Sequence, residues 1–194
     1  MRLNNKYLFY LLLVILLIGC GYNANYKIGS KFYPPNNPSK IFPFNVALIL
    51  DPDYCSSSNS TLRGWNTLTY IIGPTLCENS KTLVETVFRE YQIFSNIDEA
   101  NKMSFQLLII PKVVDTSTLF EEGHVVLRTH TSVLTEWTFL NQQGKNIYLT
   151  TAEGSASVQA IHTTAWEKAI DDLFNKLYEE ISSSQELQSF ADTI

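Results

Sequence analysis

The stretch VVLRTHTSVLTEWTF, residues 125–139, decides how the rest of this chain folds. Its odd-numbered positions hold aliphatic, aromatic or threonine side chains, and the positions between them include Arg128, His130, Ser132 and Glu136. Successive side chains of a β-strand point to opposite faces, so this alternation predicts a long strand with one covered face and one polar face. The Gly-containing loop after this strand and the run to Gln159 complete a predicted hairpin.

Two segments flanking this hairpin carry apolar residues at helical spacing. The first helix is predicted from Thr75 to Tyr91 and the second from Thr164 to Ile181. Each begins with a Thr followed three residues later by a Glu, the spacing of a capping box. A helix with one apolar stripe must pack on another element, so we expect both helices to cover the same face of the sheet.

Apolar or β-branched runs predict the remaining strands at residues 44–50, 65–72, 92–95 and 105–114. A Ser- and Asn-rich loop is expected at 55–64, and a turn or short helical fragment at 98–102. The predicted fold class is α+β: a two-layer sandwich with a mainly antiparallel sheet and two amphipathic helices packed on one face. A single domain, residues 44–182, would hold this core.

The N-terminal segment has the parts of a secretory signal. Arg2 and Lys6 precede an apolar run that ends at Ile18, and a small residue comes directly before Cys20. The run is shorter than the roughly 20 apolar residues of a membrane-spanning helix. We therefore predict a signal peptide over residues 1–19.

The pattern Leu17-Ile18-Gly19-Cys20 resembles the lipobox of bacterial lipoproteins. The resemblance implies that the chain is cut before Cys20, that the Cys20 thiol is acylated, and that the lipid tethers the mature protein to a membrane. Gly21 stands where lipoproteins retained at the inner membrane usually have an aspartate. The resemblance therefore implies an outer-membrane location that faces the periplasm.

The segments flanking the predicted domain are polar. Residues 20–43, rich in Asn, Tyr and Pro, are interpreted as a lipidated N-terminus and an extended linker, whose tyrosines could instead wrap onto the domain. Residues 183–194 are expected to form a polar C-terminal tail that frays.

Net charge limits the partners of the mature chain. Of 14 Lys and Arg residues, Arg2 and Lys6 leave with the signal, so 12 remain against 19 Asp and Glu, a formal net charge of −7. A chain this acidic has no electrostatic route to phosphate backbones, so no nucleic-acid partner is predicted.

After acylation of Cys20, Cys55 and Cys77 remain as an even pair in a compartment where disulfides persist. A disulfide between them is predicted, and two buried free thiols or a metal site are the alternatives. A metal site would need more ligands than two cysteines and three scattered histidines provide, so no metal and no cofactor is predicted.

Catalytic motifs are not found in the sequence. There is no Gly-x-Ser-x-Gly elbow and no Gly-rich phosphate loop, and the carboxylate pairs fall in a turn or on the predicted solvent side of a helix. His124, His130 and His162 are candidate bases by residue type alone. We therefore predict that the protein is not an enzyme, and keep an enzyme of unrecognised type as the last alternative.

The C-terminal third carries a second resemblance. Its outline is VLTEWTFL, then GK, then TAEG, then a helix with AIDDL. It is similar to small envelope lipoproteins with α/β domains related to the amino-terminal domain of TolB and to accessory lipoproteins of secretion and assembly machines. This resemblance implies a non-catalytic scaffold or assembly factor of an envelope complex.

The partner of such a scaffold would be an envelope protein, recognised through the polar strand face of Arg128, His130, Ser132 and Glu136 or by strand addition at an unpaired outer strand. The alternative is a binding module for a lipid, glycan or other envelope ligand. In that case Trp65, Trp137 and Trp166 would lie near a pocket between the helices and the sheet, although aromatic residues at core spacing are usually core.

Overall fold

The computed structural model describes residues 21–34, 42–122, 127–159 and 162–193. The predicted signal segment 1–19, Cys20, His124 and Val125 lie outside these ranges. The described strands are β1 Asn23–Lys27, β2 Phe42–Ile49, β3 Ser58–Arg63, β4 Asn66–Ile71, β5 Phe88–Phe94, β6 Leu107–Glu122, β7 Leu127–Asn141 and β8 Asn146–Val158. The described helices are α2 Pro52–Cys55, α3 Gly73–Val87, α4 Ile97–Ala100, α5 His162–Ser182 and α6 Gln185–Ala191.

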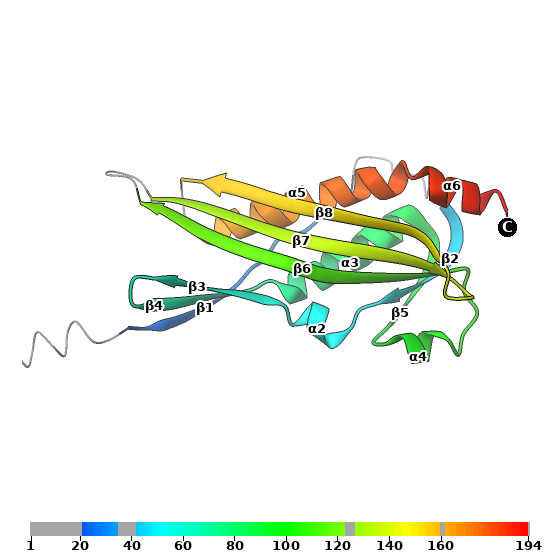
Figure 1. The fold of residues 1–194 in the computed structure, drawn as a ribbon, viewed down its shortest axis with the longest axis horizontal. Coiled ribbons are helices and arrows are strands. Elements are labelled where there is room, and N and C mark those ends of the chain that lie inside the picture. The colour runs from blue at the N-terminus through cyan, green and yellow to red at the C-terminus, as the bar shows by residue number, and fades with distance from the viewer. Residues whose placement is uncertain (1–20, 35–41, 123–126, 160–161, 194) are drawn as a thin grey trace, which may run out of the picture.

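The strands form two mixed sheets, a three-stranded sheet in the order β1-β4-β3 and a five-stranded sheet in the order β5-β2-β6-β7-β8. Pairing is parallel for β1–β4, β2–β5 and β2–β6, and antiparallel for β3–β4, β6–β7 and β7–β8. Most paired residues are antiparallel because β6, β7 and β8 are the longest strands. With α3 and α5 on one side of the sheet, the predicted α+β two-layer sandwich is confirmed (Figure 1).

The long strand β7 has the predicted alternation. Its inward residues, from Thr129 through Val133 to Phe139, are buried, and the residues between them are exposed or half-buried. β7 pairs antiparallel with β8, with Thr129 opposite Val158 and Phe139 opposite Tyr148. The predicted hairpin is therefore present, and one face of it is covered.

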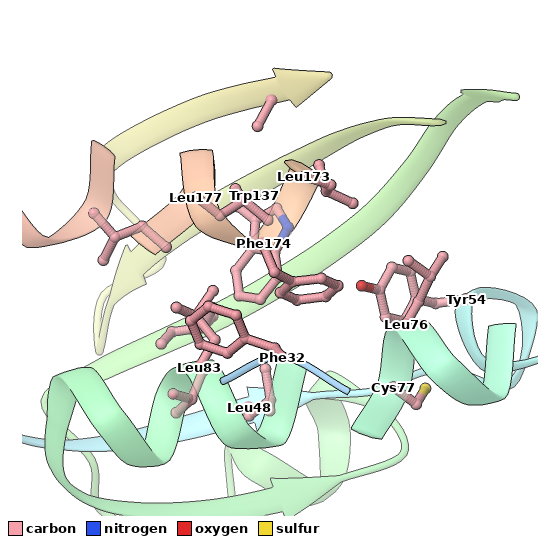
Figure 2. Packing of buried hydrophobic residues seen from close by; sticks show 14 of the residues in the cluster. Phe32, Leu48, Tyr54, Leu76, Cys77, Leu83, Trp137, Leu173, Phe174 and Leu177 are labelled. Atoms are coloured by element: carbon pink, nitrogen blue, oxygen red, sulfur yellow. The ribbon is translucent and has the colours of Figure 1, made fainter. Parts of the chain in front are cut away.

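α3 and α5 cover the same face of the five-stranded sheet and contact each other. The rings of Trp137 and Phe174 meet edge to face with their centres 6.5 Å apart, and both side chains are fully buried. Figure 2 shows Trp137 of β7 beside Leu173 and Leu177 of α5, and Phe174 of the same helix between Trp137 and Phe32. This layer is the main core, and burying each such side chain contributes about 1.5–3 kcal/mol.

Among the described residues, those that cover the opposite face of the sheet lie where β2 and β6 meet. Ala47 and Ile49 of β2 pack there with Ala100 of α4 and with Phe105 and Leu108. β2 is therefore apolar on both faces over this stretch, as expected of a central strand.

The first helix begins and ends before its predicted limits. α3 starts at Gly73, and the hydroxyl of Thr75 donates a hydrogen bond to the carbonyl of Ile28 instead of capping the helix. The helix ends before Phe88, which opens β5. In the second helix Thr164 lies inside the first turn of α5. Both predicted capping boxes are wrong, because in each case the helix begins upstream of the threonine.

The predicted loop at 55–64 is wrong, because β3 occupies most of it. The side chains of β3 are polar because they bond to a neighbouring strand instead of to an apolar layer. Asn59 Nδ2 donates to the carbonyl oxygen of Thr116 at 3.1 Å, and the hydroxyl of Thr118 donates to Asn59 Oδ1 at 2.9 Å. These bonds attach the three-stranded sheet to the edge of β6.

The two segments that flank the predicted domain, 20–43 and 183–194, contain a strand and a helix that belong to the fold. The linker interpretation is wrong for the residues from Asn23 to Phe32, since β1 pairs with β4 and Phe32 is buried. The backbone N–H of Phe32 donates to Asn79 Oδ1 of α3 at 3.0 Å. The predicted fraying tail is likewise replaced by α6, whose Leu187 is fully buried and whose N-cap is Ser184.

Cys55 and Cys77 form the predicted disulfide, with their Cα atoms 5.5 Å apart. The bond joins the end of α2 to the second turn of α3. In the chain-entropy model a loop of this length stabilises the fold by about 3 kcal/mol.

Replacing Cys77 with Ser should lower the melting temperature by roughly 10 °C, because about 3 kcal/mol of loop-closure stabilisation is lost. Thermal unfolding followed by circular dichroism measures the change. Under reducing conditions the wild type and Cys77→Ser should melt at similar temperatures. A wild-type melting temperature that reductant does not alter would contradict a stabilising disulfide.

α5 approaches β8 most closely at Gly154. A Cβ atom at this position would lie 2.0 Å from the carbonyl oxygen of Ala169 and 2.5 Å from Leu173 Cβ. No other residue type fits here without separating the helix from the sheet. Gly29, in contrast, has open space around it.

Gly154→Ala should therefore reduce the free energy of unfolding by about 1–3 kcal/mol or more, through overpacking against α5. Gly29→Ala is the matched control and should change it by less than about 0.5 kcal/mol. Urea denaturation measures both variants. Equal stability of the two variants would show that α5 does not sit this close to β8.

Candidate functional site

The residues predicted as a partner surface lie together on the outer face of β7, opposite the helices. Arg128 is exposed, and His130, Ser132 and Glu136 are half-buried. His130 Nε2 lies 3.1 Å from a carboxylate oxygen of Glu121 on β6. The structure therefore groups the four residues on one surface, while their role in binding stays a prediction.

This outer face contains an open hollow of about 380 Å³. The hollow is lined by Ser117, Leu119, His130, Thr131, Ser132, Ser155, Ala156 and Ser157. The hydroxyls of Ser117 and Ser132 are 2.8 Å apart at its floor. Leu119, at its rim, exposes 65% of its surface, and Leu149 farther along β8 exposes 50%. The face combines hydroxyl groups with aliphatic side chains whose burial against a partner would be favourable.

The outer edge of β8 is already occupied at its centre. The backbone N–H of Ser155 donates to Asp172 Oδ2 at 3.0 Å, and the carbonyl of Glu153 accepts from Lys176 Nζ at 2.8 Å. Asp172 and Lys176 also form an ion pair at 2.7 Å. Because α5 satisfies these edge groups, strand addition at the centre of β8 is disfavoured, and the open surface is the face of the sheet.

A second hollow, of about 390 Å³, opens between the three-stranded sheet and the start of α5. It is lined by Tyr22, Tyr26, Arg63, Gly64, Asn66, Leu68 and His162. The centre of the His162 ring lies 4.5 Å from that of Tyr26 and 5.5 Å from that of Tyr70, both in edge-to-face geometry. The Arg63 guanidinium lies 5.3 Å from the centre of the Phe120 ring. The walls are therefore aromatic, with one cation at the rim.

His162, which lines this hollow, has a buried Nδ1 with no hydrogen-bond partner among the described residues. The same holds for the Tyr70 hydroxyl and Trp166 Nε1, which belong to the fully buried core. Burial raises the pKa of Tyr70 to about 12. Burial, with a smaller contribution from Arg63, lowers the pKa of His162. At neutral pH both rings are therefore uncharged, and the hollow offers neutral donors and acceptors between aromatic surfaces.

The three tryptophans do not surround one pocket. Trp137 and Trp166 are fully buried in the core with Phe174, whereas Trp65 exposes 82% of its surface at the β3–β4 turn. The expectation of a tryptophan-lined pocket between the helices and the sheet is therefore wrong, because core side chains fill that space.

Within the described ranges, no group of three or more His, Cys, Asp or Glu side chains is placed to hold a metal ion. The carboxylate of Asp51 accepts the backbone N–H of Tyr54 at 2.7 Å and caps α2. In the same part of the chain, no helix is long and apolar enough to cross a membrane.

Stability should depend on the protonation of His162 at mildly acidic pH. Its pKa is lower in the folded state than the ordinary value of 6.5, so the unfolded chain binds the proton more readily. The free energy of unfolding should therefore fall as the pH drops through about 6.5 toward the folded-state pKa. In His162→Gln this part of the slope should disappear.

Urea denaturation at a series of pH values from neutral to about pH 5 measures the slope. Asn175→Gln, which changes an exposed residue of α5 that does not titrate, is the control and should keep the wild-type slope. A slope that is the same in wild type and His162→Gln would contradict the assignment.

Comparison with known proteins identifies the fold. No family model matches the sequence, and no curated protein matches it in sequence. A protein from Xanthomonas campestris, described by the family model DUF330, has a TM-score of 0.58 and 8% identity over 87% of this chain and 98% of its own. A protein from Helicobacter pylori, described as a homolog of a neuraminyllactose-binding hemagglutinin, has a TM-score of 0.52 and 12% identity over 84% of this chain and 98% of its own.

A minor lipoprotein from Acinetobacter baumannii matches more weakly, with a TM-score of 0.41 and 13% identity over 72% of this chain and 92% of its own, and we draw nothing from it. At these identities the first two likenesses concern the fold alone. This chain has the same arrangement of sheets and helices along nearly the whole length of both proteins.

Proposed function

We propose that this protein is a non-catalytic lipoprotein, anchored by acylated Cys20 in the outer membrane, that faces the periplasm and docks on a protein of an envelope complex. The lipobox at Leu17–Cys20 supports the anchor, and Gly21 supports the outer membrane over the inner. The compact α+β domain that follows would be the part that binds.

The observation that carries the docking role is the contrast between the two faces of the five-stranded sheet. The inner face is filled by large side chains such as Trp137 and Phe174. The outer face of β6, β7 and β8 is uncovered over most of its length and presents Arg128, Ser132 and the exposed Leu119. A flat face with both hydrogen-bonding groups and burial-prone aliphatic groups suits a protein partner better than a small molecule.

A binding module for an envelope ligand is the second candidate, and the hollow beside His162 favours it. Its aromatic walls would stack on a sugar ring, and the polar side chains of Arg63 and Asn66 that line it would bond to hydroxyl groups. Because the Helicobacter pylori protein is described as a homolog of a neuraminyllactose-binding hemagglutinin, neuraminyllactose is the first probe to try.

Pull-down of the intact lipoprotein from solubilised membranes tests the first candidate. Ser132→Arg places a long charged side chain in the centre of the outer face and should remove the specific partner without lowering the melting temperature. Asn175→Arg, at an exposed position on α5, is the matched control and should keep the partner. Loss of partner in both variants, or in neither, would contradict docking through this face.

The same preparation separates the two candidates. If the pull-down returns nothing above a mock control while the purified protein binds neuraminyllactose or another envelope glycan, the scaffold role fails and the ligand-binding role stands.

A further inference from the structure

Large apolar side chains are exposed together at the β3–β4 turn. Trp65 exposes 82% and Leu62 73% of its surface, and the neighbouring Tyr22 exposes 56%. The loop between the strands is only two residues long, with Gly64 at a φ of 60°, so these side chains project from a tight hairpin end. They have no role in the core or in the disulfide.

The turn is held against the residues that follow Cys20. A Cβ atom at Gly21 would lie 2.3 Å from the carbonyl oxygen of Trp65, so the two backbones touch. The N–H of Tyr22 donates to Asn66 Oδ1 at 3.0 Å, and the carbonyl of Tyr22 accepts the N–H of Thr67 at 3.2 Å. Since Gly21 is bonded to Cys20, an acyl group on that cysteine would start beside the turn.

The charge of this end differs from that of the whole chain. The three strands of the small sheet contain Lys27 and Arg63 and no Asp or Glu, whereas the full chain has a formal net charge of −5. Figure 1 shows the β3–β4 turn at the same end of the molecule as the start of β1. Glu121, near the end of β6, lies at the same end of the molecule, 3.1 Å from His130 (Figure 1). The small sheet has no acidic side chain of its own, so this sheet can approach phosphate headgroups with little repulsion.

We propose that Tyr22, Leu62 and Trp65, which we call the membrane tip, insert into the interface of the bilayer that holds the Cys20 acyl chains. Trp and Tyr favour the headgroup level, and leucine lies with the acyl chains. Arg63, the last residue of β3, lies next to Leu62 and faces the phosphates of the lipid headgroups. The proposal deepens the proposed function and depends on acylation of Cys20: the lipid supplies attachment, and the tip fixes how the domain stands on the membrane.

The test uses the full chain, purified as the lipoprotein and reconstituted into vesicles of phosphatidylethanolamine and phosphatidylglycerol with brominated acyl chains. Trp137 and Trp166 are fully buried, so Trp65 is the tryptophan that can report on lipid. Bromine should quench the Trp65 emission, which lowers the total by roughly one third, the share of one tryptophan among three. Trp65→Phe should lose this quenching.

The control is Leu149→Trp in the Trp65→Phe background, which moves the exposed tryptophan to β8, away from the tip. Bromine should not quench its emission, and acrylamide dissolved in the water should quench it. Trp65 emission that behaves in the same way would overturn the membrane tip. A photo-crosslinking amino acid at position 65 that captures a discrete protein in cells would also overturn it, in favour of a protein partner.

Mass spectrometry of the same sample separates this proposal from the proposed function. A mature chain that begins at Cys20 with its acyl groups, together with a water-exposed Trp65, overturns the tip alone. A chain with an unmodified N-terminus overturns the anchor and the tip together.

Discussion

The close packing of α5 on β7 and β8 is the contact on which the other parts of this fold depend. Gly154 has no side chain to hold the helix away from the sheet. The apolar stripe of α5 can therefore cover the inner face of the sheet around Trp137. α3 can bury its own face only because α5 and the sheet already form two sides of the core. The segment around Phe32 packs against Phe174 and Tyr178 and closes the remaining side.

The same helix also determines which surfaces stay open. By placing Asp172 and Lys176 on the edge of β8, α5 protects a long edge strand from pairing with other chains, which is how natural sheets avoid aggregation. Side chains of β3 bond to the edge of β6 that faces away from β7, and they cover part of that edge. The outer face of β6, β7 and β8 and the end that carries Trp65 are left exposed.

Patterns with strong periodicity were predictable from the sequence. The period of two in β7 placed Arg128, His130, Ser132 and Glu136 on one face, and the period of the helical stripes placed both helices on the other. The hollow beside His162 was not predictable, because Tyr26 and Arg63 reach it through strand pairs that local patterns do not encode. β1 and β3 are polar strands that pair with other strands instead of packing on an apolar layer. Their sequences therefore predicted a linker and a loop.

The start of β1 at Asn23 leaves only two residues, Gly21 and Tyr22, between Cys20 and the sheet. An extended residue spans at most about 3.5 Å, so the three steps from Cys20 to Asn23 would give the proposed lipid a linker of at most about 10 Å to the sheet. With so short a linker and the proposed membrane tip in the bilayer interface, the domain would stand at the membrane surface. A partner would then have to come close to the bilayer to meet it. Under the proposed anchor, a component of an envelope complex that lies deep in the periplasm would be out of reach unless the component itself extends to the membrane.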